Sequence, residues 1–408
     1  MKHSDYVTLI LAGGEGSRLG VLTKQMPKPT VPFGGVHRLI DFTLSNCKHS
    51  QTGVTGVITQ YRGGDIADYI GCGSQWLSEN GRAKITMLPP KTRNGITEPY
   101  TGTADAILKN ADFIEQHNPQ NVLVLSCDHV YKMNYARMIK QHLLSGAVAT
   151  ISSVDVPLSE ASRFGVIVTN KKSEIIDFEE KPANPKSYLA SMGVYIFNWP
   201  VLKRYLTKAC AASESGVDIG RDIIPAMLVA GERLSAHRFH GYWRDVGSVY
   251  SLWEANMELL SDSPGICLHE ENWKIIGRNK SGLLRHKHFR THEAYVTDSI
   301  IAEASIVKGT VSKSVVSYDV VIGEDARIVD SVIMPGVSIG RGAVVIKAIV
   351  GADAVLADYT SVGGVKPDGT YLDNNRGVSV VGSGASVFTN MDGRLKVAAL
   401  HLPEAYAV

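Results

Sequence analysis

Residues 6–19 read YVTLILAGGEGSRL, an apolar run that leads directly into a loop with three glycines. The run Tyr6–Leu11 is short and partly β-branched, which predicts a buried β-strand. Glycines let the backbone pass close to a ligand, and their N–H groups can surround phosphate oxygens. Arg18, in the same loop, carries a planar guanidinium that can hold a phosphate through two hydrogen bonds. The stretch therefore predicts a strand that ends in a phosphate-binding loop.

The spacing of this loop excludes two common nucleotide-binding motifs. A Walker A loop ends in Gly-Lys-Ser/Thr, which is absent here. A Rossmann loop reads GxGxxG, whereas Arg18 and Leu19 stand at the end of this loop and Gly20 comes one position late. Lys28 follows between two prolines, which stiffen its backbone and make it a second candidate for phosphate binding. A glycine-rich loop can also be only a tight turn, and that alternative stays open at this point.

Up to about residue 255, apolar strands alternate with helical patterns. The expected strands are Tyr6–Leu11, Val54–Ile58, Ile85–Leu88, Val122–Leu125 and Val148–Val154. Helical spacing of apolar residues lies between them, over residues 39–47 and 104–114. This alternation predicts a mostly parallel sheet with helices on both faces. In such sheets, ligands bind beyond the carboxyl ends of the strands.

From about residue 290, aliphatic residues recur six positions apart. The sets are Ile300 and Ile306; Val316, Ile322 and Ile328; Ile333, Ile339 and Val345; and Ile349 and Val355. A six-residue period in β-rich sequence predicts a hexapeptide β-helix, whose flat faces favour oligomers. A sandwich of strands with two-residue alternation is the alternative. Val378–Val381 is one further expected strand.

These patterns divide the chain into two expected domains and a linker. The first domain covers residues 1–255, the linker residues 256–290, and the β-helix domain with a carboxyl-terminal tail residues 291–408. The basic stretch Arg285–His288 in the linker is expected to be a solvated loop, with a site for an anionic effector as the alternative.

Composition and charge indicate an ordinary globular protein. The chain has 408 residues, of which 44% are hydrophobic and 20% charged, and its formal net charge of +2 gives no reason to expect nucleic acid or a membrane as partner. The amino terminus lacks the pattern of a signal peptide, and the apolar runs are shorter than the roughly 20 residues that cross a bilayer. Five cysteines without a CxxC pattern argue against disulfide frameworks and zinc ribbons. We expect a cytoplasmic protein.

Two aspartates are candidate metal ligands. Asp128 follows the expected strand Val122–Leu125, at the end where ligands bind, and Asp245 lies in the segment Tyr242–Gly247. Magnesium prefers oxygen ligands and usually takes one or two carboxylates together with substrate phosphates. Asp128 can instead cap the following helix, and Asp245 can pair with Arg244 or another base.

Residues near the expected strands 175–178 and 189–195 are candidates for a sugar site. Glu180 and Lys181 follow the first strand, where the lysine is either a surface charge or a phosphate ligand. Small residues near the start of the second strand leave room for a sugar. The remaining polar and aromatic candidates are expected to be structural: Asp105 and Glu115 on a solvated helix face, and Trp76, Trp199, Trp253 and Trp273 as packing residues.

The motifs between about residues 7 and 362 together resemble those of the glucose-1-phosphate adenylyltransferase family, also called ADP-glucose pyrophosphorylases. In order, they are LAGGEGSRL, PKPTVPFGG with RLIDFTLSNC, ITQY, YTGTADA, LSCDHVYKMNY, ASRFGV, EEKPANP, LASMGVYIF and YWRDVGSVYSLWEAN. The first, fourth, fifth and seventh are shared by sugar nucleotidyltransferases generally, while PFGG with RLIDFTLSNC, LASMG and YWRDVG are more specific to this branch. The resemblance implies an α/β fold: a Rossmann-like, mostly parallel-sheet nucleotidyltransferase domain followed by a left-handed parallel β-helix domain.

By this resemblance, the reaction joins ATP and α-D-glucose 1-phosphate into ADP-glucose and pyrophosphate for glycogen or another α-glucan. Mg²⁺ is the implied cofactor, and Asp128 and Asp245 are its implied ligands. The implied catalytic residues are Arg18, Lys28, Asp128 and Asp245. The implied nucleotide-binding residues are Leu11, Ala12, Gly13, Gly14, Gly16, Arg18 and Gly102, and the implied glucose 1-phosphate residues are Tyr100, Gly165, Glu180, Lys181 and Ser191. Gln60 and Pro99 are implied positions of regulatory communication.

Several positions depart from the family pattern. Cys127 stands before the catalytic aspartate, where the family usually has glycine, and a thiol there crowds the nucleotide side. Asn134 replaces an aspartate, and Pro99 replaces a tryptophan that often precedes Tyr100. Strongly regulated members carry basic residues ahead of the Lys-Pro step, where this chain has Gln25 and Met26. We therefore expect weak activation by sugar phosphates.

Three functions stay in view. The first is an active ADP-glucose synthase, expected as a homotetramer that acts on the small molecules ATP and glucose 1-phosphate. The second is a synthase of another specificity, such as GDP-mannose or UDP-glucose. The third is a non-catalytic regulatory subunit that assembles with a paralogue, although Arg18, Lys28, Asp128, Lys181 and Asp245, which such partners often lose, are all present.

Overall fold

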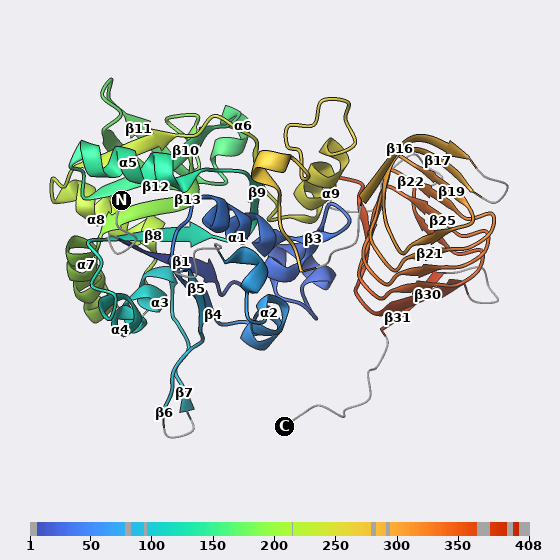
Figure 1. The fold of residues 1–408 in the computed structure, drawn as a ribbon, viewed down its shortest axis with the longest axis horizontal. Helices are drawn as coiled ribbons and strands as arrows, with labels where there is room; N and C mark the ends of the chain where they lie inside the picture. Colours follow the sequence, from blue (N-terminus) through green and yellow to red (C-terminus); the bar gives the residue numbers. More distant parts are fainter. Residues whose placement is uncertain are drawn as a thin grey trace. The chain divides into compact units, whose positions relative to one another are not determined.

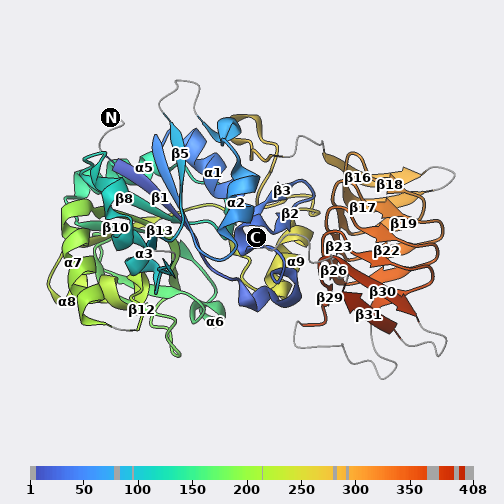
Figure 2. The same cartoon turned by 90° about the horizontal axis from the view of Figure 1, so that it is seen from below.

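A computed structural model describes residues 6–77, 83–93, 96–213, 215–278, 283–290, 294–364, 376–389 and 395–399 (Figures 1 and 2). Internal contacts divide the chain into two units that alternate along the sequence. Unit 1 is Met1–Gly14, Phe42–Trp243 and Glu271–Ile276, and unit 2 is Glu15–Asp41, Arg244–Glu270 and Gly277–Val408. The contiguous domain boundaries expected from the sequence stay a prediction.

A nine-stranded sheet forms the centre of unit 1 (Figure 1). Its strands are β1 (Tyr6–Ala12), β4 (Val54–Thr59), β5 (Lys84–Leu88), β8 (Asn121–Ser126), β10 (Ala149–Asp155), β11 (Gly165–Thr169), β12 (Ile175–Glu180), β13 (Leu189–Asn198) and β14 (Leu234–Arg238). The order is β12-β11-β13-β8-β1-β4-β5, and β10 lies between β13 and β14. β1 pairs in parallel with β4 and β8, whereas β13 runs antiparallel to β8 and β10. The expected mostly parallel α/β fold is confirmed, and all five expected strands form.

Helices and short strands surround this sheet. In chain order they are α1 (Leu39–His49), which begins in unit 2, then α2 (Gly63–Ile70), η3 (Ser74–Trp76), β6 (Thr92–Arg93), β7 (Ile96–Thr97), α3 (Thr103–Lys109), α4 (Ala111–Glu115), β9 (His129–Tyr131), α5 (Tyr135–Ser145), α6 (Leu158–Ala161), α7 (Trp199–Ala212), η4 (Ile219–Ile223), α8 (Ile224–Val229), β15 (Trp243–Asp245), which ends in unit 2, and η5 (Glu271–Trp273). The expected helix over residues 104–114 is interrupted at Asn110. Its side-chain amide donates to the Ala106 carbonyl (2.8 Å) and to the Tyr100 hydroxyl (2.9 Å), which ties the break to the loop before α3.

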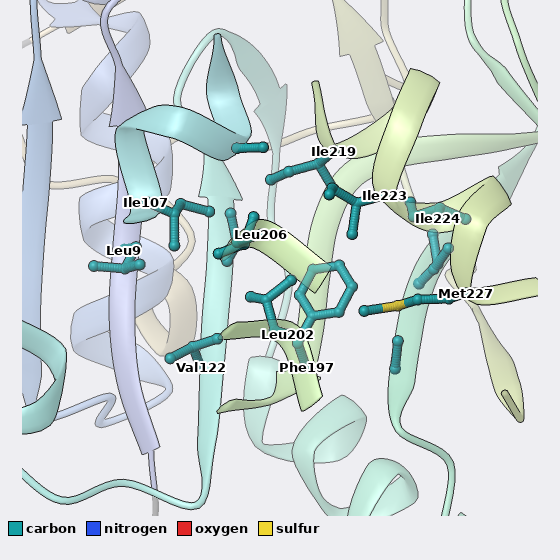
Figure 3. Close-up of a cluster of buried hydrophobic side chains, with 14 of the residues drawn as sticks. Leu9, Ile107, Val122, Phe197, Leu202, Leu206, Ile219, Ile223, Ile224 and Met227 are labelled. Atoms are coloured by element: carbon teal, nitrogen blue, oxygen red, sulfur yellow. The ribbon is translucent and has the colours of Figure 1, made fainter. Parts of the chain in front are cut away.

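The main hydrophobic core of unit 1 fills the space between the sheet and α3, α7 and α8 (Figure 3). Leu9 of β1, Val122 of β8 and Phe197 of β13 are fully buried there. Leu202 and Leu206, four residues apart on α7, face them. The helix α5 packs against β10 and β14 outside this cluster, so helices cover both faces of the sheet.

Asp105 is buried, which corrects the expectation of a solvated helix face. Its carboxylate accepts a hydrogen bond from the Thr101 backbone N–H (2.9 Å) and lies 3.1 Å from the Lys109 ammonium. A carboxylate in the first turn of a helix satisfies N–H groups that lack a helical partner. Asp105 therefore fixes the loop before α3, whereas Glu115 lies at the surface as expected and pairs with Lys203.

His142 on α5 is a buried histidine whose titration we expect to affect stability. It lies between the Thr150 hydroxyl (2.8 Å) and the Asn121 side-chain oxygen (3.1 Å), and burial lowers its pKa to about 4. The unfolded chain therefore binds a proton that the folded chain excludes between about pH 6.5 and pH 4. We expect the free energy of unfolding to fall by about 2 kcal/mol more between pH 7.5 and pH 5 in the wild type than in His142→Gln.

Urea titrations at the two pH values measure this difference. His117→Gln, which alters a partly exposed histidine of the same unit, is the control and should keep the wild-type pH dependence. If the free energy of unfolding depends on pH equally in the wild type and in His142→Gln, the titration of His142 does not affect stability.

Unit 2 contains a parallel β-helix with three faces (Figures 1 and 2). The first face is β19 (Thr310–Ser312), β22 (Arg327–Val329), β25 (Val344–Ile346) and β28 (Ser361–Gly363). The second is β20 (Val315–Val316), β23 (Val332–Ile333), β26 (Ala348–Val350) and β29 (Ser379–Val381). The third is β18 (Ile306–Val307), β21 (Val321–Ile322), β24 (Ser338–Ile339), β27 (Val355–Leu356) and β30 (Ala385–Thr389). The long strand β17 (Tyr295–Ala302) starts both the first and the second face, and β31 (Leu395–Ala399) runs antiparallel to β30. The expected β-helix and the strand near residue 380 are confirmed.

Between Val311 and Val362 the coils repeat every 17 residues, because two sides advance by six residues and the third by five. Val316, Ile322 and Ile328 occupy the three faces of one coil, and Ile333, 17 residues after Val316, starts the next. A ladder of buried serines accompanies this period: the Ser331 N–H donates to the Ser314 hydroxyl, 17 residues earlier.

Two of the expected six-residue pairs are shifted by one position. Ile301 and Val307, rather than Ile300 and Ile306, align with the core residues Val316 and Ile322. Likewise Val350 and Leu356, rather than Ile349 and Val355, belong to the β-helix core. Each of these sites has two adjacent aliphatic residues. A shift of one residue moves every side chain of a strand to the opposite face. The sequence pattern alone therefore does not decide which of the two points inward.

The basic stretch Arg285–His288 lies within β16 (Leu283–Arg290), so the expected solvated loop is wrong. This strand pairs antiparallel with β17 over seven residue pairs, from Leu283 with Ala302 to Arg290 with Tyr295. The sequence of this segment has no long apolar run that would predict a strand. The segment is a strand because its backbone forms hydrogen bonds with β17.

The amino-terminal half of unit 2 packs on the second face of the β-helix. It contains η1 (Ser17–Leu22), η2 (Lys28–Thr30), β2 (Pro32–Phe33), β3 (His37–Arg38) and α9 (Val249–Glu258). The Trp253 indole N–H on α9 donates to the Asp330 carbonyl (2.6 Å), and the Lys347 ammonium lies 5.4 Å from the same ring. This cover explains why outward-facing Ile349 on β26 is fully buried.

Removing the Trp253 ring should weaken unit 2. Trp253→Ala is expected to lower the free energy of unfolding by about 2–4 kcal/mol, since it removes apolar contact and a hydrogen bond together. Trp253→Phe keeps most of the ring and should cost only about 1 kcal/mol. Calorimetric melting of the three proteins measures the effect, and an alanine variant as stable as the wild type would contradict it.

None of the helices formed by the described residues combines the length and the hydropathy that a bilayer crossing requires.

Candidate active site

The carboxyl ends of β1, β4, β5 and β8 lie along one edge of the unit 1 sheet. Leu11 at the end of β1 aligns with Ser126 at the end of β8, and Ala12 aligns with Thr59 at the end of β4. Cys127 is buried directly after β8, and its thiol donates to the Leu11 carbonyl (3.2 Å). The start of the glycine loop and Asp128 therefore lie at the same edge, where ligands bind in sheets of this kind.

Gln60 connects the glycine loop with Tyr100. A Cβ atom at Gly13 would contact the Gln60 side chain at 3.4 Å, and the Gln60 side-chain oxygen accepts a hydrogen bond from the Tyr100 N–H. Tyr100 is buried, donates to the Leu88 carbonyl (3.2 Å), and has a pKa raised by that burial. The implied regulatory positions Gln60 and Pro99 thus both adjoin Tyr100.

Asp128 does not cap the helix that follows it. The helix α5 is capped by Asn134, whose side chain accepts from the Ala136 N–H (3.0 Å). The Asp128 carboxylate instead accepts a hydrogen bond from the Ser126 hydroxyl and lies 3.4 Å from the His129 imidazole. Its side chain is 29% exposed, so its oxygens are accessible at the edge of the sheet.

The implied glucose 1-phosphate residues of β11, β12 and β13 lie together in unit 1. Gly165 aligns with Glu180 across β11 and β12, and the position next to Ser191 aligns with β11 as well. Lys181 follows Glu180 directly, in a left-handed backbone conformation (φ 48°), and its ammonium lies 2.9 Å from the Glu180 carboxylate. Its side chain is 60% exposed and is therefore accessible from solvent.

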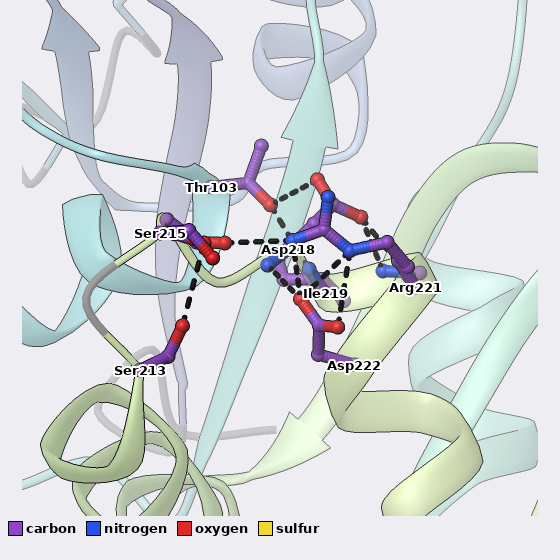
Figure 4. Close-up of polar contacts among 9 residues, drawn as sticks. Thr103, Ser213, Ser215, Asp218, Ile219, Arg221 and Asp222 are labelled. Atoms are coloured by element: carbon purple, nitrogen blue, oxygen red, sulfur yellow. Dashed lines mark hydrogen bonds and ion pairs between the residues drawn. The ribbon is translucent and has the colours of Figure 1, made fainter.

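A network around Asp218 connects the loop before α3 with η4 (Figure 4). Asp218 accepts hydrogen bonds from the Thr103 hydroxyl (2.8 Å) and from the Gly220 and Arg221 N–H groups (2.8 and 3.1 Å). Its own N–H donates to the Asp222 carboxylate (2.7 Å), which the Arg221 guanidinium also contacts. Gly102, an implied nucleotide-binding residue, is therefore held next to a rigid turn.

Four side chains of this region were not predicted from the sequence: His129, Tyr195, Asp218 and Trp243. The Tyr195 hydroxyl accepts from Ser191 (3.3 Å), and burial raises its pKa, with smaller contributions from the Glu180 and Asp218 carboxylates. Trp243 packs edge-on against His129 at 5.1 Å, and its buried N–H has no hydrogen-bond partner among the described residues. His129 directly follows Asp128 and Trp243 lies two positions before Asp245, so their places in the sequence were a signal, whereas Tyr195 and Asp218 have no distinctive spacing.

Unit 2 brings Gly16, Arg18, Lys28 and Asp245 together. Lys28 is buried, and its ammonium lies 3.8 Å from the Asp245 carboxylate. Gly16 has a left-handed φ of 70°, and a Cβ atom there would lie 2.7 Å from the Lys28 side chain, so only glycine fits. A Cβ atom at Gly247 would lie 2.9 Å from the Arg18 guanidinium and 2.8 Å from the Asp245 carboxylate, which places both groups around one point.

Asp245 lies beside a base, as the structural alternative expected. The Arg244 guanidinium pairs with Glu258 on α9 (3.1–3.2 Å from Nε), and the base beside Asp245 is Lys28. The charge of Asp245 is balanced by Lys28, a residue more than 200 positions away in the sequence. The structure thus groups the implied residues within each unit, whereas their roles toward ligands stay predictions.

Known proteins share both parts of this architecture. The family model of nucleotidyl transferases matches residues 7–262, and a model of the GlmU-like carboxyl-terminal hexapeptide region matches residues 285–381. A glucose-1-phosphate adenylyltransferase of Bacillus cytotoxicus is 46% identical over 358 residues, which cover 88% of this chain and 94% of that protein. The chain belongs to the glucose-1-phosphate adenylyltransferase family. Relatives with the same name from Bacillus mycoides and Bacillus cereus are 45% identical over 356 residues, 87% of this chain and 94% of theirs.

Family membership confirms the resemblance found in the motifs. The match to nucleotidyl transferases covers the unit 1 sheet, and the hexapeptide match covers most of the β-helix coils. Both parts of the expected fold class are thereby confirmed.

Proposed function

We propose that this chain transfers the adenylyl group of ATP to α-D-glucose 1-phosphate, giving ADP-glucose and pyrophosphate. The observation that carries the proposal is the 45–46% identity to relatives of that name over nearly the whole of their length. The grouping of Arg18, Lys28 and Asp245 in one unit, and of the sugar-site residues in the other, supports the same chemistry. ADP-glucose would then serve α-glucan synthesis.

The reaction needs positioning and charge balance rather than a nucleophilic side chain. An oxygen of the sugar phosphate forms a bond to the α-phosphorus of ATP, while the bond to the β-phosphate oxygen breaks and its electrons leave with pyrophosphate. Arg18 and Lys28 would balance the charge that accumulates on the departing pyrophosphate. Lys181 would hold the attacking phosphate, and Tyr100, Gly165, Glu180 and Ser191 would line the glucose pocket.

The donor set fits a magnesium ion. The carboxylates of Asp128 and Asp245 are hard oxygen ligands, and magnesium is usually held by one or two such groups together with phosphates. Bound there, the ion would supply positive charge that offsets the charge of the phosphates. The proposal requires both aspartates to reach the same ion, with Lys28 limiting the negative charge beside Asp245.

A nucleotide panel tests the proposed specificity. Pyrophosphate release from glucose 1-phosphate and Mg²⁺ should be fastest with ATP and at least about tenfold slower with GTP, UTP or dTTP. Faster release with GTP or UTP would favour a synthase of other specificity. Activity that appears only after a paralogous chain is added would favour the regulatory-subunit alternative.

We also propose that the chain forms a homotetramer. The outer side of the third β-helix face carries Ile306, Val321 and Val355, which are 54%, 42% and 41% exposed, with Ser338 between the two valines. Such a mainly apolar surface fits a second copy of the same surface. Light scattering should give about four times the chain mass, and Val321→Lys should lower the oligomeric state.

A further inference from the structure

Unit 1 has a wide, open depression outside the implied active site. It lies between the helix α5, the edge strand β14 and the turn that joins β11 to β12, and its volume is about 670 Å³. None of the residues implied in substrate or metal binding lines it. We call it the α5 hollow.

Four cationic side chains line the α5 hollow, and no acidic residue lines it. Arg137 and Lys140 lie one turn apart on α5, Lys172 lies in the β11–β12 turn, and Arg238 ends β14. The side chains of Arg137, Lys140 and Lys172 have no ion pair within the part of the chain that the structure describes, while Arg238 lies 3.9 Å from Asp155. Three cations from two elements therefore share one concave surface without compensation.

Hydrogen bonds between the three elements hold the floor of the α5 hollow. Gln141 on α5 donates to the Ala236 carbonyl of β14 (3.0 Å), and its side-chain oxygen bonds the His237 ring (2.6 Å). The Ala236 N–H donates to the Ser173 carbonyl in the β11–β12 turn (2.8 Å). The cations therefore project from a preformed surface, and a ligand need not assemble it.

We propose that the α5 hollow binds a small anion with two or more phosphate groups. Like charges on a concave surface raise the local positive potential, which a multivalent anion relieves. Arginine offers a planar fork for one phosphate, and lysines offer mobile point charges for another. The cations come from α5, from the turn and from β14, so an anion with two or more linked phosphate groups can contact more of them than a single phosphate can.

The α5 hollow is close to the implied sugar site, which shapes the experiment. Arg238 aligns with Ser153 on β10, and Ser153 aligns with Ser191 on β13. Adjacent strands are about 4.8 Å apart, so only about 10 Å of sheet separates Arg238 from Ser191. A phosphate probe must therefore be measured with the active site occupied.

Calorimetric titration of the full-length protein with inorganic tripolyphosphate, in saturating ADP-glucose, tests the proposal. We expect saturable binding that weakens as salt screens the charges, and at least tenfold weaker binding in the double variant Arg137→Glu, Lys140→Glu. Turnover with ATP and glucose 1-phosphate should stay within twofold of the wild type. The difference in tripolyphosphate binding between the wild type and the double variant depends only on the α5 hollow, whichever ligand fills the active site. Its result is therefore independent of the proposed function.

Matched variants decide the outcome. Lys208→Glu reverses an exposed charge on α7, away from the α5 hollow, and should leave tripolyphosphate binding unchanged. Lys140→Gln removes one charge and keeps a side chain of similar length, so it should not disturb the fold. It should weaken tripolyphosphate binding by a smaller factor than the double variant does. It therefore tests the proposal even if the double variant misfolds. The proposal is overturned if the wild type does not bind tripolyphosphate, or if the double variant and Lys208→Glu bind it equally.

Discussion

Replacing Asp128 by asparagine is expected to lower kcat by a factor of about 10³ while leaving the fold unchanged. Asparagine has the same shape and can still accept the hydrogen bond of the Ser126 hydroxyl, so the end of β8 should keep its structure. The substitution removes one negative charge and weakens a ligand of the proposed magnesium ion. Turnover at saturating ATP and glucose 1-phosphate, with Mg²⁺ varied, measures the effect.

A matched aspartate separates this role from a general effect of charge. Asp112→Asn changes a carboxylate that is 87% exposed in the same unit, paired with Lys91, and should keep wild-type turnover. Higher Mg²⁺ should restore part of the activity of Asp128→Asn, since the weakened site would fill again. A loss of less than tenfold, with no change in Mg²⁺ dependence, would exclude Asp128 as a metal ligand.

Replacing Lys181 by glutamine is expected to raise the KM for glucose 1-phosphate by a factor of about 100 and to leave the KM for ATP unchanged. A charge-assisted hydrogen bond to a phosphate is worth about 2–3 kcal/mol, and each 1.4 kcal/mol is a factor of ten. The Lys181 side chain is 60% exposed and contacts Glu180, so its loss should affect the ligand more than the fold. Initial rates with each substrate varied in turn measure the two constants.

Lys186 is a control from the same part of the chain. It is 58% exposed and pairs with Asp177 and Glu179, so Lys186→Gln removes an equivalent charge close in sequence. It should keep both KM values. If the two variants raise the KM for glucose 1-phosphate equally, the effect comes from the overall field of the surface, and Lys181 does not bind the phosphate.

The features that depend on neighbours in sequence were predictable. The short apolar strands and the six-residue period of the β-helix follow from local patterns, because burial on one side of a strand or helix imposes a fixed spacing. The glycine loop after β1 and Asp128 after β8 were placed at the ends of their strands for the same reason. The motifs, which are local strings of residues, were also sufficient to indicate the family.

Features that depend on distant partners were not predictable. Asp105 is buried on α3, which packs against α7 and η4 from far along the chain. The segment β16 is a strand because β17 pairs with it, although its own sequence has no pattern that predicts a strand. The inward register of Val350 over Ile349 depends on stacking against the next coil.

The sequence by itself determined the two kinds of fold, the family and the residue types that can bind phosphate and metal. Only the tertiary structure decided that Lys28 balances Asp245 and that Asp218 holds the loop before α3. It also decided that cations of α5 and the β11–β12 turn, which have no ion pair among the described residues, share one hollow. The spacing of apolar residues shows which side of a helix or strand is buried, because that spacing is local. Charge pairs and hydrogen bonds depend on which elements lie next to each other, and this is decided only when the chain folds.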